Sequence, residues 1–244
     1  MKKAEELETS YVVMTGDFCN GRVLPRNATE KEFVSQSNPI IDLLREFRDI
    51  KGRFVLGNHD PIKITDHLTK LPHLMDIHGL NTNFGDYKVG GIGGSHKVTP
   101  QLLYKTLPFP EGYFPDLIDE FPDLEYLRKI NNPRAPYVYS SVHKLYDTVF
   151  PCDILVSHTP PLLPNSQNYY QASAGLYRLI EQYKPLVSVS AHIHTPKKHV
   201  EEISWCNSKK TILFNVGSLD DKKIGLITLS RQKKKVVALE MISI

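Results

Sequence analysis

The stretch Arg53-Phe54-Val55-Leu56-Gly57-Asn58-His59-Asp60 joins a short apolar run directly to a polar turn that contains glycine. The arrangement recurs along the chain, with a polar or glycine-containing segment after each apolar run: Ser10–Thr15 before Gly16-Asp17, Tyr87–Ile92 before Gly93-Gly94-Ser95, Asp153–Ser157 before His158, Leu186–Ser190 before Ala191-His192-Ile193-His194, and Thr211–Asn215 before Val216-Gly217-Ser218. Runs rich in Val, Ile and Leu without strict alternation are typical of strands buried on both faces. The pattern therefore predicts a buried sheet whose strands end in polar turns.

The segments between these runs carry helical periodicity. Apolar residues recur in Ile40–Ile50 with charged residues between them, and Ala172–Tyr183 shows a similar apolar face. Alternation of strands and helices predicts a layered α/β domain. Towards the end of the chain, Gly225–Leu229 and Lys235–Ile242 are typical of a closing hairpin.

Length and composition describe an ordinary globular chain. At about 150 residues per domain, 244 residues correspond to one large domain or at most two small ones, and we interpret 1–244 as a single domain. With 41% hydrophobic and 23% charged residues, the composition excludes intrinsic disorder. No apolar run approaches the ~20 residues of a transmembrane helix, so no membrane span is predicted.

The cysteines and the N-terminal residues indicate the compartment, and the net charge bears on the substrate. Three widely spaced cysteines (Cys19, Cys152 and Cys206) argue against a disulfide framework and for a reducing, cytoplasmic location. Met1–Glu6 leads into no apolar region, which predicts no secretory signal. A net charge of +3 does not demand nucleic acid, but it suits a phosphate-bearing substrate.

The segment at about 99–141 differs from the rest, because it is rich in proline and aromatic residues. We interpret it as a long irregular or partly helical insertion. Long loops of compact domains are usually functional lids or disordered segments. The aromatic content favours an ordered lid or an interface, and the alternative is a surface loop without a functional role.

Residues able to bind a metal stand at the carboxyl ends of the predicted strands: Asp17, Asn58, His158, and His192 with His194. Ligands of open α/β sheets bind at the carboxyl ends of the strands. Carboxylate, amide oxygen and imidazole suit Mn, Fe, Zn or Ni. Two such ions at ~3.5–4 Å can clamp the attacking and leaving oxygens of a phosphoryl displacement.

Each of these motifs also has an ordinary structural interpretation. Gly16-Asp17 is a common turn, and Asp60 can cap a following helix with Pro61 in its first position. His158 can be a loop histidine, and His192 and His194 share one face if the chain is extended. The occurrence of all the motifs in this order, each directly after a strand, favours a metal centre.

Together these motifs resemble the calcineurin-like metallophosphoesterase superfamily. The matching segments run from about residue 2 to residue 230: Gly16-Asp17-Phe18-Cys19-Asn20, Gly57-Asn58-His59-Asp60, Gly91-Ile92-Gly93-Gly94-Ser95, Ser157-His158-Thr159-Pro160-Pro161, Ala191-His192-Ile193-His194 and Asn215-Val216-Gly217-Ser218. The resemblance implies an αββα fold, a two-sheet β-sandwich flanked by helices. It also implies hydrolysis of a phosphomonoester or phosphodiester, with a small phosphate ester as substrate.

The resemblance implies a role for each matching residue. Asp17 would bridge two metals, and Asn58, His158 and His192 would complete one of the two sites. His194 would bind the other metal. Manganese is the expected ion, with Fe, Zn or Ni as alternatives. A bridging hydroxide, its pKa lowered by the ions, would attack phosphorus in line.

Two further residues are expected at the substrate. The resemblance implies that His59 is catalytic, since it would stabilise the transition state or protonate the leaving oxygen. His59 and Asn20 are both expected to contact substrate. Asn20 stands where the family usually has aspartate, so it keeps hydrogen-bonding ability and loses the charge. Ala191 stands where the family usually has glycine, a mild change unless the backbone there needs a positive φ.

The opening Asp-x-His-Gly motif of the family is absent before Asp17. We therefore expect the first strand of the fold and two ligands to be missing, and an upstream start of the true chain would explain the loss. Asp76-Ile77-His78-Gly79 has the right letters but follows the Gly-Asn-His-Asp motif. Without the first strand, the edge of the Ser10–Thr15 strand is open, which predicts aggregation, homodimerisation through that edge, or rescue by another segment.

Ligand counting predicts one tightly bound metal and a second, partial one. The first site keeps Asp17, Asn58, His158 and His192, whereas the second keeps only Asp17 and His194. Activity is then expected to be weak if hydrolysis needs both ions. The alternative is a catalytically degenerate member of the fold that acts as an interaction module.

Three lysine pairs and one run of three lysines make the last fifth of the chain basic: Lys197-Lys198, Lys209-Lys210, Lys222-Lys223 and Lys233–Lys235. The ordinary interpretation is a solvated charged face. Nucleic acid is the alternative partner, and its binding would depend strongly on salt.

Overall fold

The structure is a computed structural model that describes most of the chain outside one long central segment. The residues described are 11–19, 30–46, 48–57, 60, 64–94, 148–163, 172–194, 196, 198–217, 223–230, 232 and 235–243. The expected insertion at 99–141 lies outside them, as do Asn20, Asn58 and His59.

Strands dominate the described residues. They are β1 (Tyr11–Met14), β2 (Lys51–Phe54), β3 (Leu74–Asp76), β4 (Asn81–Phe84), β5 (Tyr87–Ile92), β6 (Ile154–Ser157), β7 (Val187–Ser190), β8 (Val200–Ser204), β9 (Lys210–Asn215), β10 (Lys223–Ser230) and β11 (Lys235–Ser243). The helical elements are α2 (Glu30–Glu46), α3 (Ile64–Leu68), α7 (Ala174–Tyr183) and a 3-10 turn, η2 (Cys206–Ser208).

The strands form three hydrogen-bonded groups. The first is a parallel sheet in the order β1-β2-β3, and the second is a six-stranded sheet in the order β4-β5-β6-β7-β9-β8. Within the second sheet, β5, β6, β7 and β9 run parallel, while β4 and β8 pair antiparallel at the two edges. The third group is the antiparallel hairpin β10-β11. Parallel strands bring their carboxyl ends to one edge, as the site requires.

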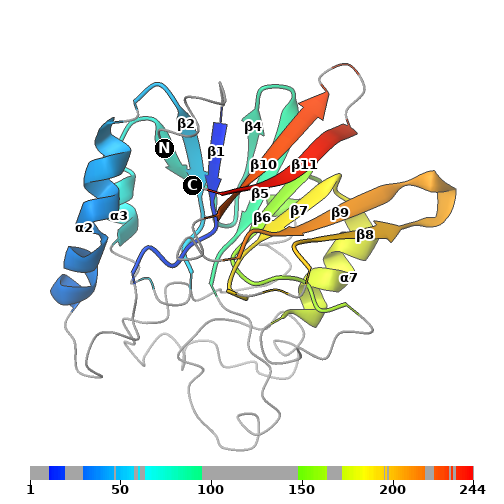
Figure 1. Ribbon diagram of the computed structural model, residues 1–244, viewed down its shortest axis with the longest axis horizontal. Helices are drawn as coiled ribbons and strands as arrows, with labels where there is room; N and C mark the ends of the chain where they lie inside the picture. The colour runs from blue at the N-terminus through cyan, green and yellow to red at the C-terminus, as the bar shows by residue number, and fades with distance from the viewer. Residues whose placement is uncertain are drawn as a thin grey trace, which may run out of the picture.

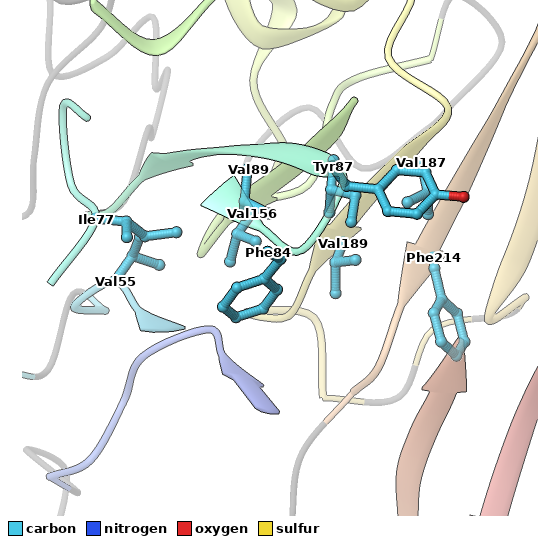
Figure 2. Packing of buried hydrophobic residues seen from close by; sticks show 10 residues of the cluster. Val55, Ile77, Phe84, Tyr87, Val89, Val156, Val187, Val189 and Phe214 are labelled. Atoms are coloured by element: carbon cyan, nitrogen blue, oxygen red, sulfur yellow. The ribbon is translucent and has the colours of Figure 1, made fainter. Parts of the chain in front are cut away.

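An apolar core joins the six-stranded sheet to the other two groups. Its buried members come mainly from β5, β6, β7 and β9, and partly buried residues of β1, β3, β10 and β11 pack against them. Figure 2 shows the side chains of this cluster packed together, with Phe84 and Phe214 among them. The hairpin Gly225–Leu229 and Lys235–Ile242 expected from the sequence is confirmed, with one face on this core.

Helices cover the outer faces of the sandwich. Ile41 and Leu44 of α2 and Leu68 of α3 pack against Phe54 of β2 in a second cluster. On the opposite side, α7 packs Leu176, Leu179 and Ile180 against the six-stranded sheet in a third cluster. Figure 1 shows α2 and α3 beside β1 and β2, and α7 at the far side of the molecule. The αββα architecture expected from the resemblance is therefore confirmed.

Two short, half-exposed strands and the first part of one helix were not predicted from the sequence pattern. Strand β5 has the predicted bounds, but β4 (Asn-Thr-Asn-Phe) and β8 (Val-Glu-Glu-Ile-Ser) were not predicted. Both are edge strands with polar residues, so they carry no apolar run. Helix α2 begins ten residues before the predicted Ile40, because periodicity marks only the part of a helix that faces the core.

None of the helices in the described part of the chain is both long and apolar enough to cross a membrane.

Candidate metal centre

Three of the predicted ligands meet at the ends of three strands. Asp17 follows β1, His158 follows β6 and His192 follows β7. Their ligand atoms all lie within 4.8 Å of one another. One carboxylate and two imidazoles at this spacing form a group that can hold a single divalent cation.

The ring of His158 is oriented by a backbone carbonyl. His158 is 1% exposed, and its Nδ1 donates to the carbonyl oxygen of Thr15 at 2.6 Å. Because a carbonyl only accepts, the neutral ring carries its proton on Nδ1 and presents the lone pair of Nε2. That atom lies 3.4 Å from Oδ2 of Asp17 and 3.1 Å from Nδ1 of His192. Such an arrangement selects the tautomer that binds a metal.

Asp17 lies in a turn with unusual backbone geometry. Its φ is 59°, a left-handed conformation that costs energy for a residue other than glycine. The neighbouring Gly57 lies so close that a Cβ atom there would collide with Oδ1 and the backbone nitrogen of Asp17. The turns after β1 and β2 therefore touch, and the contact requires glycine at position 57.

Asp60 fastens these two turns together. Its carboxylate accepts hydrogen bonds from the backbone nitrogens of Asp17 at 2.7 Å, Cys19 at 2.8 Å and Gly57 at 2.8 Å. These three donors lie outside α3 (Ile64–Leu68), and because residues 61–63 lie outside the described residues, the interpretation of Asp60 as a helix cap stays a prediction. Asp60 ends the Gly-Asn-His-Asp motif, so the sequence marks it as a residue of interest. Its hydrogen-bond partners lie up to 43 residues away, so the sequence does not show what it contacts.

The centre carries a local excess of negative charge. Burial, together with the charge of Asp17, raises the pKa of Asp60 to about 7, against the opposing effect of the three backbone N–H groups. A cation beside Asp17 would offset this repulsion. The donor chemistry and the charge of the group therefore fit a divalent metal.

His192 also lies in the left-handed region, with φ of 61°. The family position usually occupied by glycine is Ala191, which does not have a positive φ. The unusual conformation thus falls on the histidine, and alanine is accommodated without backbone strain.

The other predicted residues are placed differently. His194 is exposed and lies outside the group formed by Asp17, His158 and His192. Asn20, Asn58 and His59 lie outside the described residues.

The Asp76–Gly79 segment has a structural use. Oδ1 of Asp76 accepts from the backbone nitrogen of His78 at 2.8 Å, and Nδ1 of His78 accepts from Gly93 at 2.8 Å. These contacts fasten the turn after β3 to the end of β5. Neither side chain belongs to the group of three possible ligands found within the described ranges.

Comparison with known proteins agrees with this geometry. Residues 1–196 match the family model described as calcineurin-like phosphoesterase. The crystal structure of TT1561 of Thermus thermophilus is similar in fold, with a TM-score of 0.57 and 17% sequence identity over 99% of this chain and 89% of that chain. No curated protein sequence matches the chain. Since the family match covers most of the sequence, the chain belongs to the calcineurin-like phosphoesterase family.

Proposed function

We propose that this protein is a metal-dependent hydrolase of a small phosphomonoester or phosphodiester. The observation that carries the proposal is the convergence of Asp17, His158 and His192, whose ligand atoms lie within 4.8 Å of one another. Family membership supports phosphoester chemistry in general. The carboxyl ends of parallel strands are the usual place for such a site.

The residues of the centre divide into ligands and supports. Asp17, His158 and His192 hold the metal, and the carbonyl of Thr15 keeps the Nε2 lone pair of His158 turned towards it. Asp60 holds the turn that presents Asp17. When bound, divalent ions supply Lewis acidity, which polarises phosphoryl oxygens and activates water.

Four more residues enter the proposal from their sequence positions. Asn58 completes the first site, since it directly follows Gly57, whose backbone touches Asp17. His194 contributes to a second, weaker site. His59 protonates the leaving oxygen, and it contacts the substrate together with Asn20.

Manganese is the ion we propose, with one tight and one partial site per chain. A carboxylate and two imidazoles suit Mn²⁺, and Fe, Zn or Ni are the alternatives. All three cysteines are free, with Cys19 and Cys152 buried, which supports a reducing, cytoplasmic location.

The test combines metal binding with catalysis in four proteins. Mn²⁺ affinity and stoichiometry are measured by calorimetry for the wild type, His192→Ala, Asp17→Asn and the control His67→Ala, whose side chain lies on α3. Hydrolysis of an aryl phosphomonoester and an aryl phosphodiester is then measured with each protein. Because loss of a residue that only supports a ligand already costs about 10–100-fold in affinity, loss of a direct ligand is expected to cost about 100-fold or more.

The results separate enzyme from interaction module. Tight binding of one ion, with hydrolysis lost in His192→Ala and Asp17→Asn but kept in His67→Ala, supports the proposal. Metal binding without hydrolysis of either substrate supports the interaction module instead. Equal Mn²⁺ affinity in all four proteins would refute the metal centre itself.

A further inference from the structure

We infer that Asn215 is a positioning residue that holds His192 in the conformation required at the metal centre. The inference rests on the proposed metal site and gives a role to the first residue of the Asn215-Val216-Gly217-Ser218 motif. Asn215 is the last residue of β9, and only 9% of its surface is exposed.

The backbone around His192 forms a tight three-residue turn. The nitrogen of Ile193 donates to the carbonyl oxygen of Ala191 at 2.7 Å, across a central residue with φ of 61°. A turn of this kind with positive φ is a rare and strained γ-turn. Strained conformations persist only where the surroundings hold them, so some contact must keep His192 in place.

The side chain of Asn215 supplies such a contact. Its Nδ2 donates to the same carbonyl oxygen of Ala191 at 3.2 Å, while its Oδ1 accepts from the nitrogen of Gly217 at 2.9 Å. One amide therefore links the turn that carries His192 to the turn that follows β9. The two turns also touch directly, since a Cβ at Gly217 would lie 3.0 Å from the carbonyl oxygen of His194.

Asn215 itself is held rigidly. Its backbone nitrogen donates to the carbonyl of His199 at 2.8 Å, and Nδ1 of His199 donates back to the carbonyl of Asn215 at 2.8 Å. The next residue, Val216, donates to the carbonyl of Ser190 at 2.9 Å. A side chain on so constrained a backbone can position its partner closely.

The other side of the turn is tied to the second imidazole ligand. The nitrogen of Ala191 donates to the carbonyl of His158 at 3.0 Å. Ala191 is thereby fixed between His158 and Asn215, and the rings of His158 and His192 meet edge to face with centroids 4.9 Å apart. The distance between the two imidazole ligands depends on this backbone segment.

Only an amide matches both contacts of Asn215. It donates to one carbonyl and accepts from one N–H at the same time. Aspartate keeps the acceptor for Gly217 but presents an oxygen to the carbonyl of Ala191. Alanine removes both contacts and leaves a buried carbonyl with one bond fewer.

The test compares Asn215→Asp and Asn215→Ala with a matched control. Asn81→Asp removes a similar amide, which donates to the carbonyls of Val149 and Pro151 at the opposite end of β6 from His158. Mn²⁺ dissociation constants are measured by calorimetry. The ring ¹⁵N shifts of His192 are recorded by NMR in the metal-free proteins, with His192→Ala providing the assignment. Thermal unfolding establishes that each variant is folded.

Both Asn215 variants are expected to bind Mn²⁺ about tenfold more weakly, the usual effect of losing a residue that supports a ligand, and to shift the ring nitrogens of His192. Asn81→Asp is expected to lose stability but to keep the affinity and the ring shifts. Asn215→Asp keeps the contact with Gly217 but loses the one with Ala191. Its Mn²⁺ affinity is therefore expected to fall even though one of the two contacts remains.

Wild-type affinity and unchanged ring shifts in Asn215→Asp would overturn the inference and leave the proposed function intact. The inference would also be overturned if Asn81→Asp weakened Mn²⁺ binding as much as the Asn215 variants do. The weaker binding would then reflect a general loss of stability. If the wild type shows no Mn²⁺ binding that depends on His192, the proposed function fails. The ring shifts of the metal-free proteins then still decide whether Asn215 holds His192.

Discussion

At the scale of single residues, two of the three side chains of the candidate metal centre belong to residues in unfavourable backbone conformations. Asp17 and His192 both have positive φ, at 59° and 61°. Such residues store strain of about 1–3 kcal/mol each, which neighbouring contacts must offset. The contacts are specific: the Asp60 carboxylate fastens the turn of Asp17, and the Asn215 amide fastens the turn of His192.

Gly57→Ala is predicted to damage the candidate metal centre without replacing any of its possible ligands. Its methyl group would collide with the carboxylate and the backbone nitrogen of Asp17. We expect a loss of about 2 kcal/mol in the free energy of unfolding and at least about tenfold weaker Mn²⁺ binding. Chemical denaturation and calorimetry measure the two effects.

Gly52→Ala is the control for this variant, because its methyl group would meet the side chain of Leu74 at the first residue pair between β2 and β3. It is expected to lower stability and leave Mn²⁺ affinity unchanged. An unaltered affinity in Gly57→Ala would contradict the close contact with Asp17.

The cysteines are predicted to differ in reactivity. Burial raises the pKa of the Cys152 thiol to about 12, against a backbone hydrogen bond from Gly90. Burial and the charges of Asp60 and Asp17 raise the pKa of Cys19 well above its usual range. Both thiols therefore stay protonated at about pH 8, whereas Cys206 is exposed.

A thiol reagent is accordingly expected to label only Cys206 in the native protein and all three cysteines after denaturation. Mass spectrometry of the labelled peptides identifies the sites. Rapid native labelling of Cys19 would show that the turn after β1 opens readily.

At the scale of elements, helix α7 illustrates how local chemistry supports the sheet that carries two of the possible ligands, His158 and His192. Ser173 caps the helix, since its hydroxyl accepts from the nitrogen of Leu176 at 3.1 Å. The helix ends at Lys184 in a left-handed conformation, with φ of 52°. Between these ends, Leu176 and Ile180 belong to the same buried cluster as Leu155 of β6, the strand that precedes His158.

Ser173→Ala is predicted to lower the free energy of unfolding by about 1 kcal/mol, the usual cost of losing an N-cap. Ser173→Thr keeps a hydroxyl and is expected to retain most of the stability. Urea denaturation measures both, and Mn²⁺ affinity is expected to stay the same in each. A change in affinity for Ser173→Ala would mean that α7 acts on the centre directly.

At the scale of the whole molecule, the position of β1 at the edge of the three-stranded sheet bears on how copies of the chain associate. In the part of the chain that the structure describes, β1 pairs with β2 only. Tyr11 and Val13 turn towards the central core, whereas Met14 packs under α2. A strand with one unpaired edge is a template for pairing with another chain.

We predict that the protein forms homodimers through β1. Light scattering coupled to size-exclusion chromatography, over a wide range of protein concentration, is expected to show a dimer. Hydrogen exchange compared between dilute and concentrated samples is expected to protect the backbone of residues 11–14 selectively. A monomer at every concentration would contradict the prediction.

The pattern of the sequence was sufficient to identify the elements with strong local signals. Apolar runs ending in polar turns predicted β5 and β6 almost to the residue, and Asp17, His158 and His192 were recognised as possible ligands. These features depend on residues that are neighbours in the chain. The motifs also led to the family, since each is short and contiguous.

Tertiary structure alone decided how these residues support one another. The carbonyl that orients His158 belongs to Thr15, 143 positions away, and the carboxylate that fastens Asp17 lies 43 positions away. Likewise, no local pattern shows that the positive φ falls on His192 rather than Ala191, because the turn is held by Asn215 from another strand. Sequence patterns report local periodicity, whereas these contacts form only when distant strands are packed side by side.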